Sequence, residues 1–156
     1  MNVAFTLGRI ALVVIFVISG AQKLLDIAGT ADQIQSKVAL PAALSDITSQ
    51  IEAMLGMPIW QTLAIVVALV EVIGGMLIAF NVLTRTVAVI LLLFTAVTTF
   101  YFHDFWRMPS DSPERVNNMI HALKNLSIIG AFLMLAAWPR RVIVSDAPEH
   151  ERLEPL

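Results

Sequence analysis

A polar segment between two long apolar runs, residues 98–125, carries most of the side chains that could do chemistry. Its imidazole, carboxylate, indole, ammonium and amide groups belong to His103, Asp104, Trp106, His121, Lys124 and Asn125. Histidine can bind a metal or transfer protons, and lysine and asparagine side chains donate hydrogen bonds. The segment could therefore be a metal site, a proton relay, a cofactor pocket or only the wet end of a membrane bundle.

The ligand types argue against a metal. Zinc takes three or four Cys, His or carboxylate ligands, and the segment offers only His103, Asp104 and His121, in a chain without cysteine. Haem needs axial ligands on opposed sides of its iron, which two histidines near one surface fit poorly. A quinone headgroup asks only for a donor or two at an apolar cleft, which His103 or Lys124 could supply. We expect no metal and no evident cofactor, with quinone left open.

A simpler interpretation competes with the ligand site. His103 and Trp106 would anchor helix ends at the membrane interface, where aromatic side chains gather. Lys124 would extend its ammonium group to the lipid headgroups. Under this interpretation the segment binds nothing.

Four apolar runs must position these groups, and they cover about residues 3–25, 59–83, 86–102 and 119–138. About 20 apolar residues are enough to cross a bilayer as a helix. We expect an all-α integral membrane four-helix bundle over residues 1–141, followed by a polar C-terminal tail, residues 142–156. The composition agrees, because 58% of the residues are hydrophobic and 14% charged, against about half and a quarter in soluble domains. The net charge of -2 gives no basic face for nucleic acid.

The connection between the first two runs is too long for a turn. Leu44, Ile47 and Ile51 recur at helical spacing after Pro41, which predicts one additional amphipathic helix. It would lie on the membrane surface, cap the bundle, or be a loop helix packed on the domain.

Glu71 is a carboxylate near the middle of the second run. An ionised group there costs roughly 2.5–3.5 kcal/mol on insertion scales, so it should face the bundle and have a partner. It shares a helix face with the small residues Ala64, Ala68, Gly75 and Ala79. Counting depth from a shared membrane face predicts Arg9 as the partner, with Lys124 second. The pair could fix helix register or belong to a proton or quinone site.

The remaining polar groups should meet at one end of the bundle. Thr99 and His103 share a face of the third helix, and His121, Lys124 and Asn125 share a face of the fourth. These groups and Lys23 lie on the membrane side opposite the termini. Basic residues count five on each side, but Arg85 and the Arg140-Arg141 pair sit directly at helix ends. We therefore expect both termini in the cytoplasm.

Four pieces of sequence, one per run and in order, resemble the DoxX family of small four-helix membrane proteins. They are "LGRIALVVIFVISGAQKL", "VEVIGGMLIAFNVLTRTVAVIL", "TTFYFHDFW" and "ALKNLSIIGAFLML", within residues 5–138. The family pattern falls on Arg9, Ser19, Gly20, Lys23, Glu71, Gly74, Gly75, Thr84, Arg85, His103, Asp104, Trp106, Lys124 and Asn125. Asn81 departs from it, where the family more usually has glycine, but asparagine tolerates the left-handed conformation of a tight turn.

The resemblance implies this fold and a bacterial inner-membrane location, and it assigns no catalytic residues. Some relatives are described as subunits of thiosulfate:quinone oxidoreductases or as partners of oxidative-stress enzymes. Our first hypothesis is a non-catalytic accessory subunit of a larger membrane redox or respiratory assembly, bound to other subunits or to a second copy. The alternative is a quinone-reactive oxidoreductase subunit, and the third hypothesis is a small-molecule or proton permease. The sequence does not decide whether the chain is an enzyme.

Overall fold

The computed structural model describes residues 3–138, and within this range it contains helices and no strand. The elements are α1 (Val3–Leu25), α2 (Ile27–Lys37), η1 (Ala42–Leu44), α3 (Ser45–Leu55), α4 (Ile59–Ala79), α5 (Thr84–Phe102), η2 (Phe105–Arg107) and α6 (Pro113–Ala137). By length and composition, α1, α4, α5 and α6 could each cross a membrane. The predicted all-α membrane bundle is confirmed, while the predicted tail lies outside the described residues.

Helix ends follow local chemistry. The Ser112 hydroxyl accepts a hydrogen bond from the Arg115 amide at 3.1 Å, and Pro113 is the first residue of α6, which is the favoured start of a helix. The second span ends at Ala79, earlier than the predicted residue 83, because a turn follows. Asn81 (φ 63°) adopts the expected left-handed conformation, and Leu83 (φ 48°) joins it.

Two helices, rather than the single predicted one, connect α1 to α4. The Asp26 carboxylate caps α2 by accepting from the Gly29 amide at 2.9 Å, a start signal that the prediction missed. The predicted amphipathic helix is α3, none of whose residues is buried. Glu52 of α3 accepts a hydrogen bond from the Ile59 amide at 2.8 Å, so α3 caps the N-terminus of α4.

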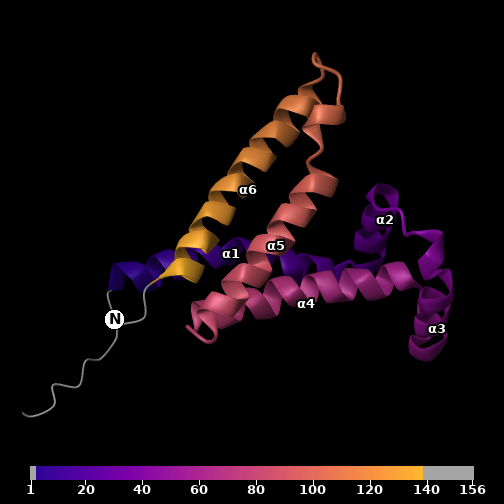
Figure 1. The fold of residues 1–156 in the computed structure, drawn as a ribbon, viewed down its shortest axis with the longest axis horizontal. Helices are drawn as coiled ribbons and strands as arrows, with labels where there is room; N and C mark the ends of the chain where they lie inside the picture. Colours follow the sequence, from indigo (N-terminus) through magenta and orange to yellow (C-terminus); the bar gives the residue numbers. More distant parts are fainter. Residues whose placement is uncertain (1–2, 139–156) are drawn as a thin grey trace, which may run out of the picture.

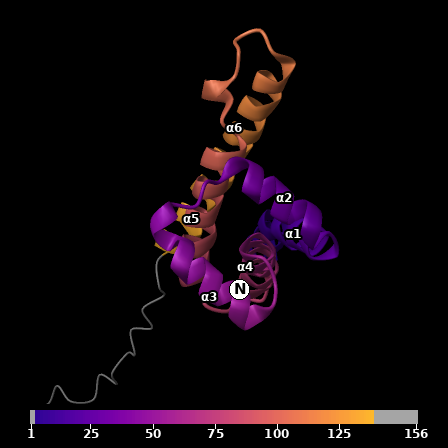
Figure 2. The same ribbon diagram turned by 90° about the vertical axis from the view of Figure 1, so that its right-hand side faces the viewer.

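The four long helices form two antiparallel pairs, α1 with α4 and α5 with α6, and contacts between α4 and α5 join them. Figures 1 and 2 show that the pairs meet near the N-terminus and diverge toward α2 and the tip of the α5–α6 hairpin. The bundle is therefore V-shaped, with α2 on the inner side of the α1–α4 arm.

The buried core lies where the two pairs meet. Val13, Ile78, Leu91 and Phe132 are all buried to within 1% exposure, and the rings of Phe16 and Phe132 are 5.4 Å apart. This core joins the two arms at the end where α1 begins and α6 ends.

Close packing of α1 on α4 depends on glycine. A Cβ atom at Gly20 would lie 2.7 Å from the Ala68 carbonyl oxygen, and one at Gly75 would lie 2.8 Å from a Val17 methyl group. Real Cβ atoms do not approach so closely, so the small-residue face that carries Glu71 is where the two backbones come together.

A polar cavity between the helix pairs

The two arms enclose a cavity of about 570 Å³, which α2 closes on one side. Its lining is mostly apolar, and its polar members include Lys23, Glu71, Thr95, His103, His121 and Asn125. This volume falls in the usual range of about 300–1,000 Å³ for small-molecule sites. A few polar groups in an apolar wall are also what such sites contain.

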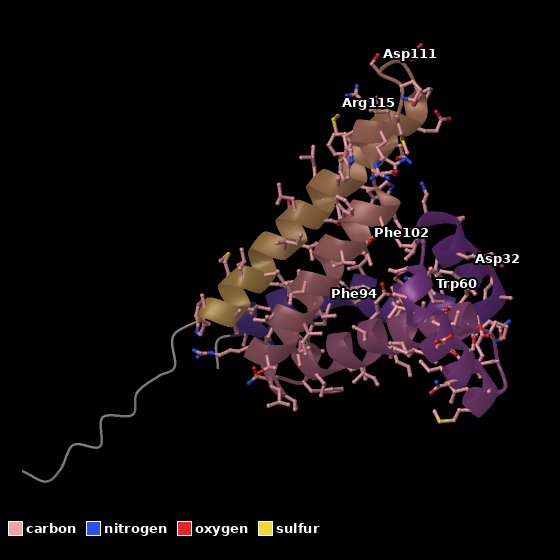
Figure 3. The ribbon with its side chains drawn as sticks, turned by 45° about the vertical axis from the view of Figure 1, so that its right-hand side comes forward. Asp32, Trp60, Phe94, Phe102, Asp111 and Arg115 are labelled. Carbon is pink, nitrogen blue, oxygen red and sulfur yellow. The ribbon has the colours of Figure 1, made fainter. Side chains whose placement is uncertain are left out.

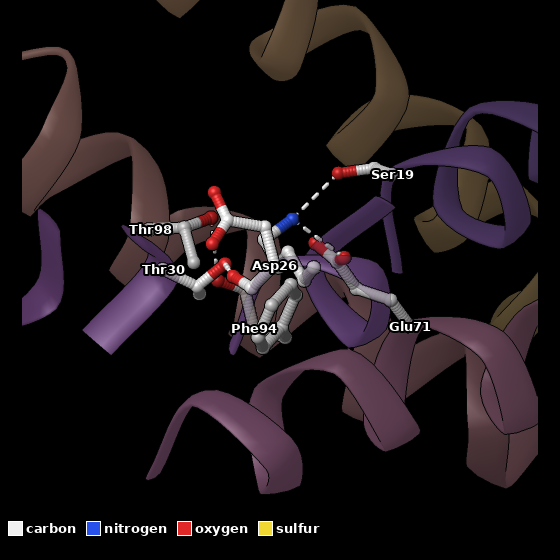
Figure 4. A network of polar contacts seen from close by, with 7 residues as sticks. Ser19, Asp26, Thr30, Glu71, Phe94 and Thr98 are labelled. Atoms are coloured by element: carbon white, nitrogen blue, oxygen red, sulfur yellow. Dashed lines mark hydrogen bonds and ion pairs between the residues drawn. The ribbon is translucent and has the colours of Figure 1, made fainter. Parts of the chain in front are cut away.

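An ion pair lies in the wall of this cavity. The Lys23 ammonium group is 2.7 Å from the Glu71 carboxylate and 2.6 Å from the Ser19 hydroxyl, the contacts dashed in Figure 4. The Lys23 side chain is 27% exposed and that of Glu71 is 8% exposed. Because an ammonium group has three protons, Lys23 keeps one donor for a molecule in the cavity.

The predicted partner of Glu71 was wrong. Arg9 is also buried, but its Nη2 donates to the Ala79 carbonyl at 3.4 Å. Ala79 lies two turns beyond Glu71, roughly 12 Å along α4. The prediction aligned the helices by a shared membrane face, whereas the contacts of Gly20 and Gly75 set their register and bring Lys23 to Glu71.

Arg9 is enclosed at the opposite end of α1 from Lys23. It is 2% exposed, and its guanidinium carbon lies 5.8 Å from the centre of the Phe5 ring. Its Nε and Nη1 atoms have no hydrogen-bond partner within residues 3–138. Arg9 does not line the cavity.

Two histidines from neighbouring helices stack at the loop end of the cavity. The rings of His103 and His121 are 5.1 Å apart and nearly parallel, with an interplanar angle of 11°. His103 Nδ1 lies 3.2 Å from the Asn118 amide oxygen, whose identity follows from the bond that Asn118 Nδ2 donates to the Glu114 carbonyl at 3.0 Å. In neutral His103 the proton is therefore on Nδ1, and Nε2 is an acceptor rather than the donor we expected.

Hydrogen bonds within the α5–α6 hairpin hold Asn125 and Thr99 in place. Asn125 donates to the Thr99 hydroxyl at 2.9 Å, and Thr99 donates to the Thr95 carbonyl at 2.6 Å. Asn125 lines the cavity, while Thr99 is not part of its wall. Thr99 therefore acts on the site only by orienting Asn125.

The other predicted residues lie outside the cavity wall. Asp104 is 3.5 Å from the Lys37 ammonium group at the end of α2. Trp106 is 47% exposed and contacts the Phe100 ring, with a centroid distance of 5.6 Å. Lys124 is exposed on α6. Within residues 3–138, no group of three or more His, Asp or Glu residues could hold a metal ion.

Sequence reasoning missed the contribution of α2. Thr30, Gln33 and Ile34 of this helix line the cavity, and Ile34 packs in a cluster with Phe102 of α5 and Trp60 of α4. Figure 3 shows Phe102 near α2, on the inner side of the V. The sequence signal for α2 was Asp26, which caps the start of this helix. A separate signal, for the surroundings of Lys23, was Ser19 one turn earlier on the same face of α1.

The fold and the cavity define a four-helix membrane protein with a polar site between its helix pairs. A family model, DoxX, matches residues 4–104, and the chain belongs to this family, as the sequence pieces predicted. It is 34% identical to "Inner membrane protein YphA" of Escherichia coli (strain K12) over 86% of this chain and 81% of that protein. It is 32% identical to "Inner membrane protein YqjF" of the same organism over 86% and 83% of the two chains. No solved structure matches it significantly.

Proposed function

We propose that the cavity binds the headgroup of a membrane-dissolved quinone, and that the chain is the quinone-binding subunit of a larger redox assembly in the bacterial inner membrane. The observation that carries this proposal is the Lys23–Glu71 pair, which lies in a cavity wall rather than in a sealed core. A pair that only fixed register would need no cavity beside it. The names of the two relatives, both inner membrane proteins, support the membrane assignment.

The polar groups match both redox forms of a quinone. Lys23 Nζ has one N–H group beyond those that it donates to Glu71 and Ser19, and this group can donate a hydrogen bond to a quinone carbonyl. The unprotonated Nε2 of His103 can accept a hydrogen bond from a quinol hydroxyl. Lys23 and His103 come from different arms of the V, so one headgroup could touch both arms.

The test is the binding of a quinone analogue to the purified chain. Removing an accepting histidine should weaken binding by up to about tenfold, the equivalent of one hydrogen bond, so His103→Ala is the first variant. Lys23→Met combined with Glu71→Leu removes the charged donor without leaving an unpaired charge, and it should weaken binding by at least about tenfold. Lys124→Met is the matched control, because Lys124 is exposed and lies outside the cavity wall.

Two outcomes would contradict the proposal. Wild-type protein that binds no quinone analogue would end it for the isolated chain. Equal binding by the wild type, both site variants and the control would place any quinone site elsewhere.

A second candidate is the accessory subunit without a ligand of its own. Its specific support is α3, where Ile47 and Met54 are 54% and 78% exposed and could contact a partner subunit or the bilayer surface. A gentle purification that yields a defined membrane partner, together with absent quinone binding, would favour it. The permease hypothesis would require the core around Phe16 and Phe132 to open.

The orientation stays part of the proposal, with both termini in the cytoplasm. A cysteine at Ser110, in the loop before α6, should then react with an impermeant thiol reagent in intact cells. A cysteine at Ser145 should not react.

A further inference from the structure

The cavity is itself amphipathic along its length, and this polarity deepens the proposed function on which the inference rests. At the loop end its wall contains Lys23, His103 and His121. Toward the middle of the bundle the wall contains the apolar side chains of Phe94 and Ile128. The hydroxyls of Thr95 and Thr98 also line it there, but they donate to carbonyl groups of their own helix at 2.6 and 3.0 Å. A molecule that fills the cavity should therefore have a polar head at the loop end and an apolar remainder.

The apolar part of the wall reaches the outer surface of the bundle. Ile15 and Val97 both line the cavity, yet they are 55% and 56% exposed. Ile15 continues an exposed apolar stripe of α1 that includes Ile18, at 54% exposure. Val97 continues a similar stripe of α5 that includes Leu93, at 58% exposure. In a membrane-spanning bundle such stripes face lipid.

These openings lie at the depth of the hydrocarbon. Ile15 is near the middle of α1, and Val97 lies about one turn beyond the middle of α5. The cavity does not continue toward the terminal end, because the core closes it with the Phe16–Phe132 contact and the fully buried Leu91. Its apolar part is therefore open to the lipid phase.

We infer that the cavity is filled from the bilayer by a tailed amphiphile, whose head lies at Lys23 and His103 and whose tail leaves past Ile15 or Val97. This occupant has the orientation of a lipid in the leaflet on the loop side. For the proposed quinone, the tail is the part that passes through the opening.

The first experiment compares two benzoquinones with the same headgroup, one with a decyl tail and one without, bound to the full chain in nanodiscs. Ile15→Trp and Val97→Trp, tested singly and together, should obstruct the openings. The double variant should weaken binding of the tailed probe by roughly tenfold or more and leave the tailless probe nearly unchanged. Ile18→Trp and Leu93→Trp are matched controls on the same helices, because Ile18 and Leu93 are about equally exposed but lie outside the wall of this cavity.

The second experiment does not depend on quinone binding. The chain has no cysteine, so Ile128→Cys provides a single attachment point for a bimane fluorophore in the cavity wall. Lipids brominated in mid-chain should quench it relative to unbrominated lipids. Ile15→Phe with Val97→Phe, which add bulk without the quenching of bimane by tryptophan, should relieve that bromine-dependent quenching.

The outcomes separate the two proposals. If brominated lipids quench the fluorophore but neither quinone binds, the proposed function is overturned, whereas the opening of the cavity to lipid is supported. No quenching of the labelled protein, or tailed-probe binding equal in blocked and control variants, would overturn the entrance.

Discussion

Two basic residues on the same helix, one buried and one partly exposed, have opposite surroundings. Lys23 has two acceptors, Glu71 and Ser19, and part of its side chain faces a cavity. Within residues 3–138, Arg9 has a single acceptor, at 3.4 Å, and it is enclosed by the core. Position along α1 accounts for the difference, because Arg9 lies where the helix pairs meet and Lys23 where they have diverged. Of the two side chains, only that of Lys23 can therefore reach a molecule in the cavity.

The largest expected effect is the loss of the Lys23 counterion. Glu71→Ala should lower the free energy of unfolding in detergent by about 3 kcal/mol, the low end for a broken buried pair, because Lys23 is partly exposed. Thermal unfolding would measure it. Adding Lys23→Met should restore much of the loss, whereas adding Arg9→Met should not. Rescue by Arg9→Met instead would contradict the pairing in the structure.

A smaller loss is expected where α1 touches α4. Gly20→Val should destabilise the protein by about 1–3 kcal/mol, as overpacking usually does, because the new side chain would meet the Ala68 carbonyl. Gly8→Val is the control, since nothing lies within 4 Å of a Cβ atom there. Equal denaturation midpoints for the two variants would show that Gly20 does not set the register that brings Lys23 to Glu71.

The smallest effect should come from Arg9. Arg9→Met should change the free energy of unfolding by no more than about 1 kcal/mol, because an apolar side chain often replaces a poorly paired buried charge without loss. The cation–π contact between Arg9 and Phe5, which this substitution removes, contributes about 0.5–1 kcal/mol to stability. A loss as large as that of Glu71→Ala would show that Arg9 has a charged partner, and the contrast with Lys23 would disappear.

The lengths of the apolar runs were enough to predict the four spans, and a mid-membrane carboxylate on a small-residue face was enough to place Glu71 inside the bundle. The partner of Glu71 was not predictable, because it depends on the register between α1 and α4. Register follows from contacts such as that of Gly20 with Ala68, which have no signature along the chain. The grouping of His103, His121 and Asn125 at one end followed from topology. The cavity could not be predicted in this way, because it depends on the angle between the two helix pairs and on the position of α2.

The pairing of α1 with α4 has a consequence for biogenesis. Glu71 follows Lys23 by 48 residues, so the ribosome must make α2, α3 and half of α4 before the carboxylate exists. At roughly 5–20 residues per second, Lys23 waits several seconds for its partner. During that interval α1 can hold its ammonium group only at the aqueous interface. We therefore expect α1 to reach its final depth only when α4 arrives.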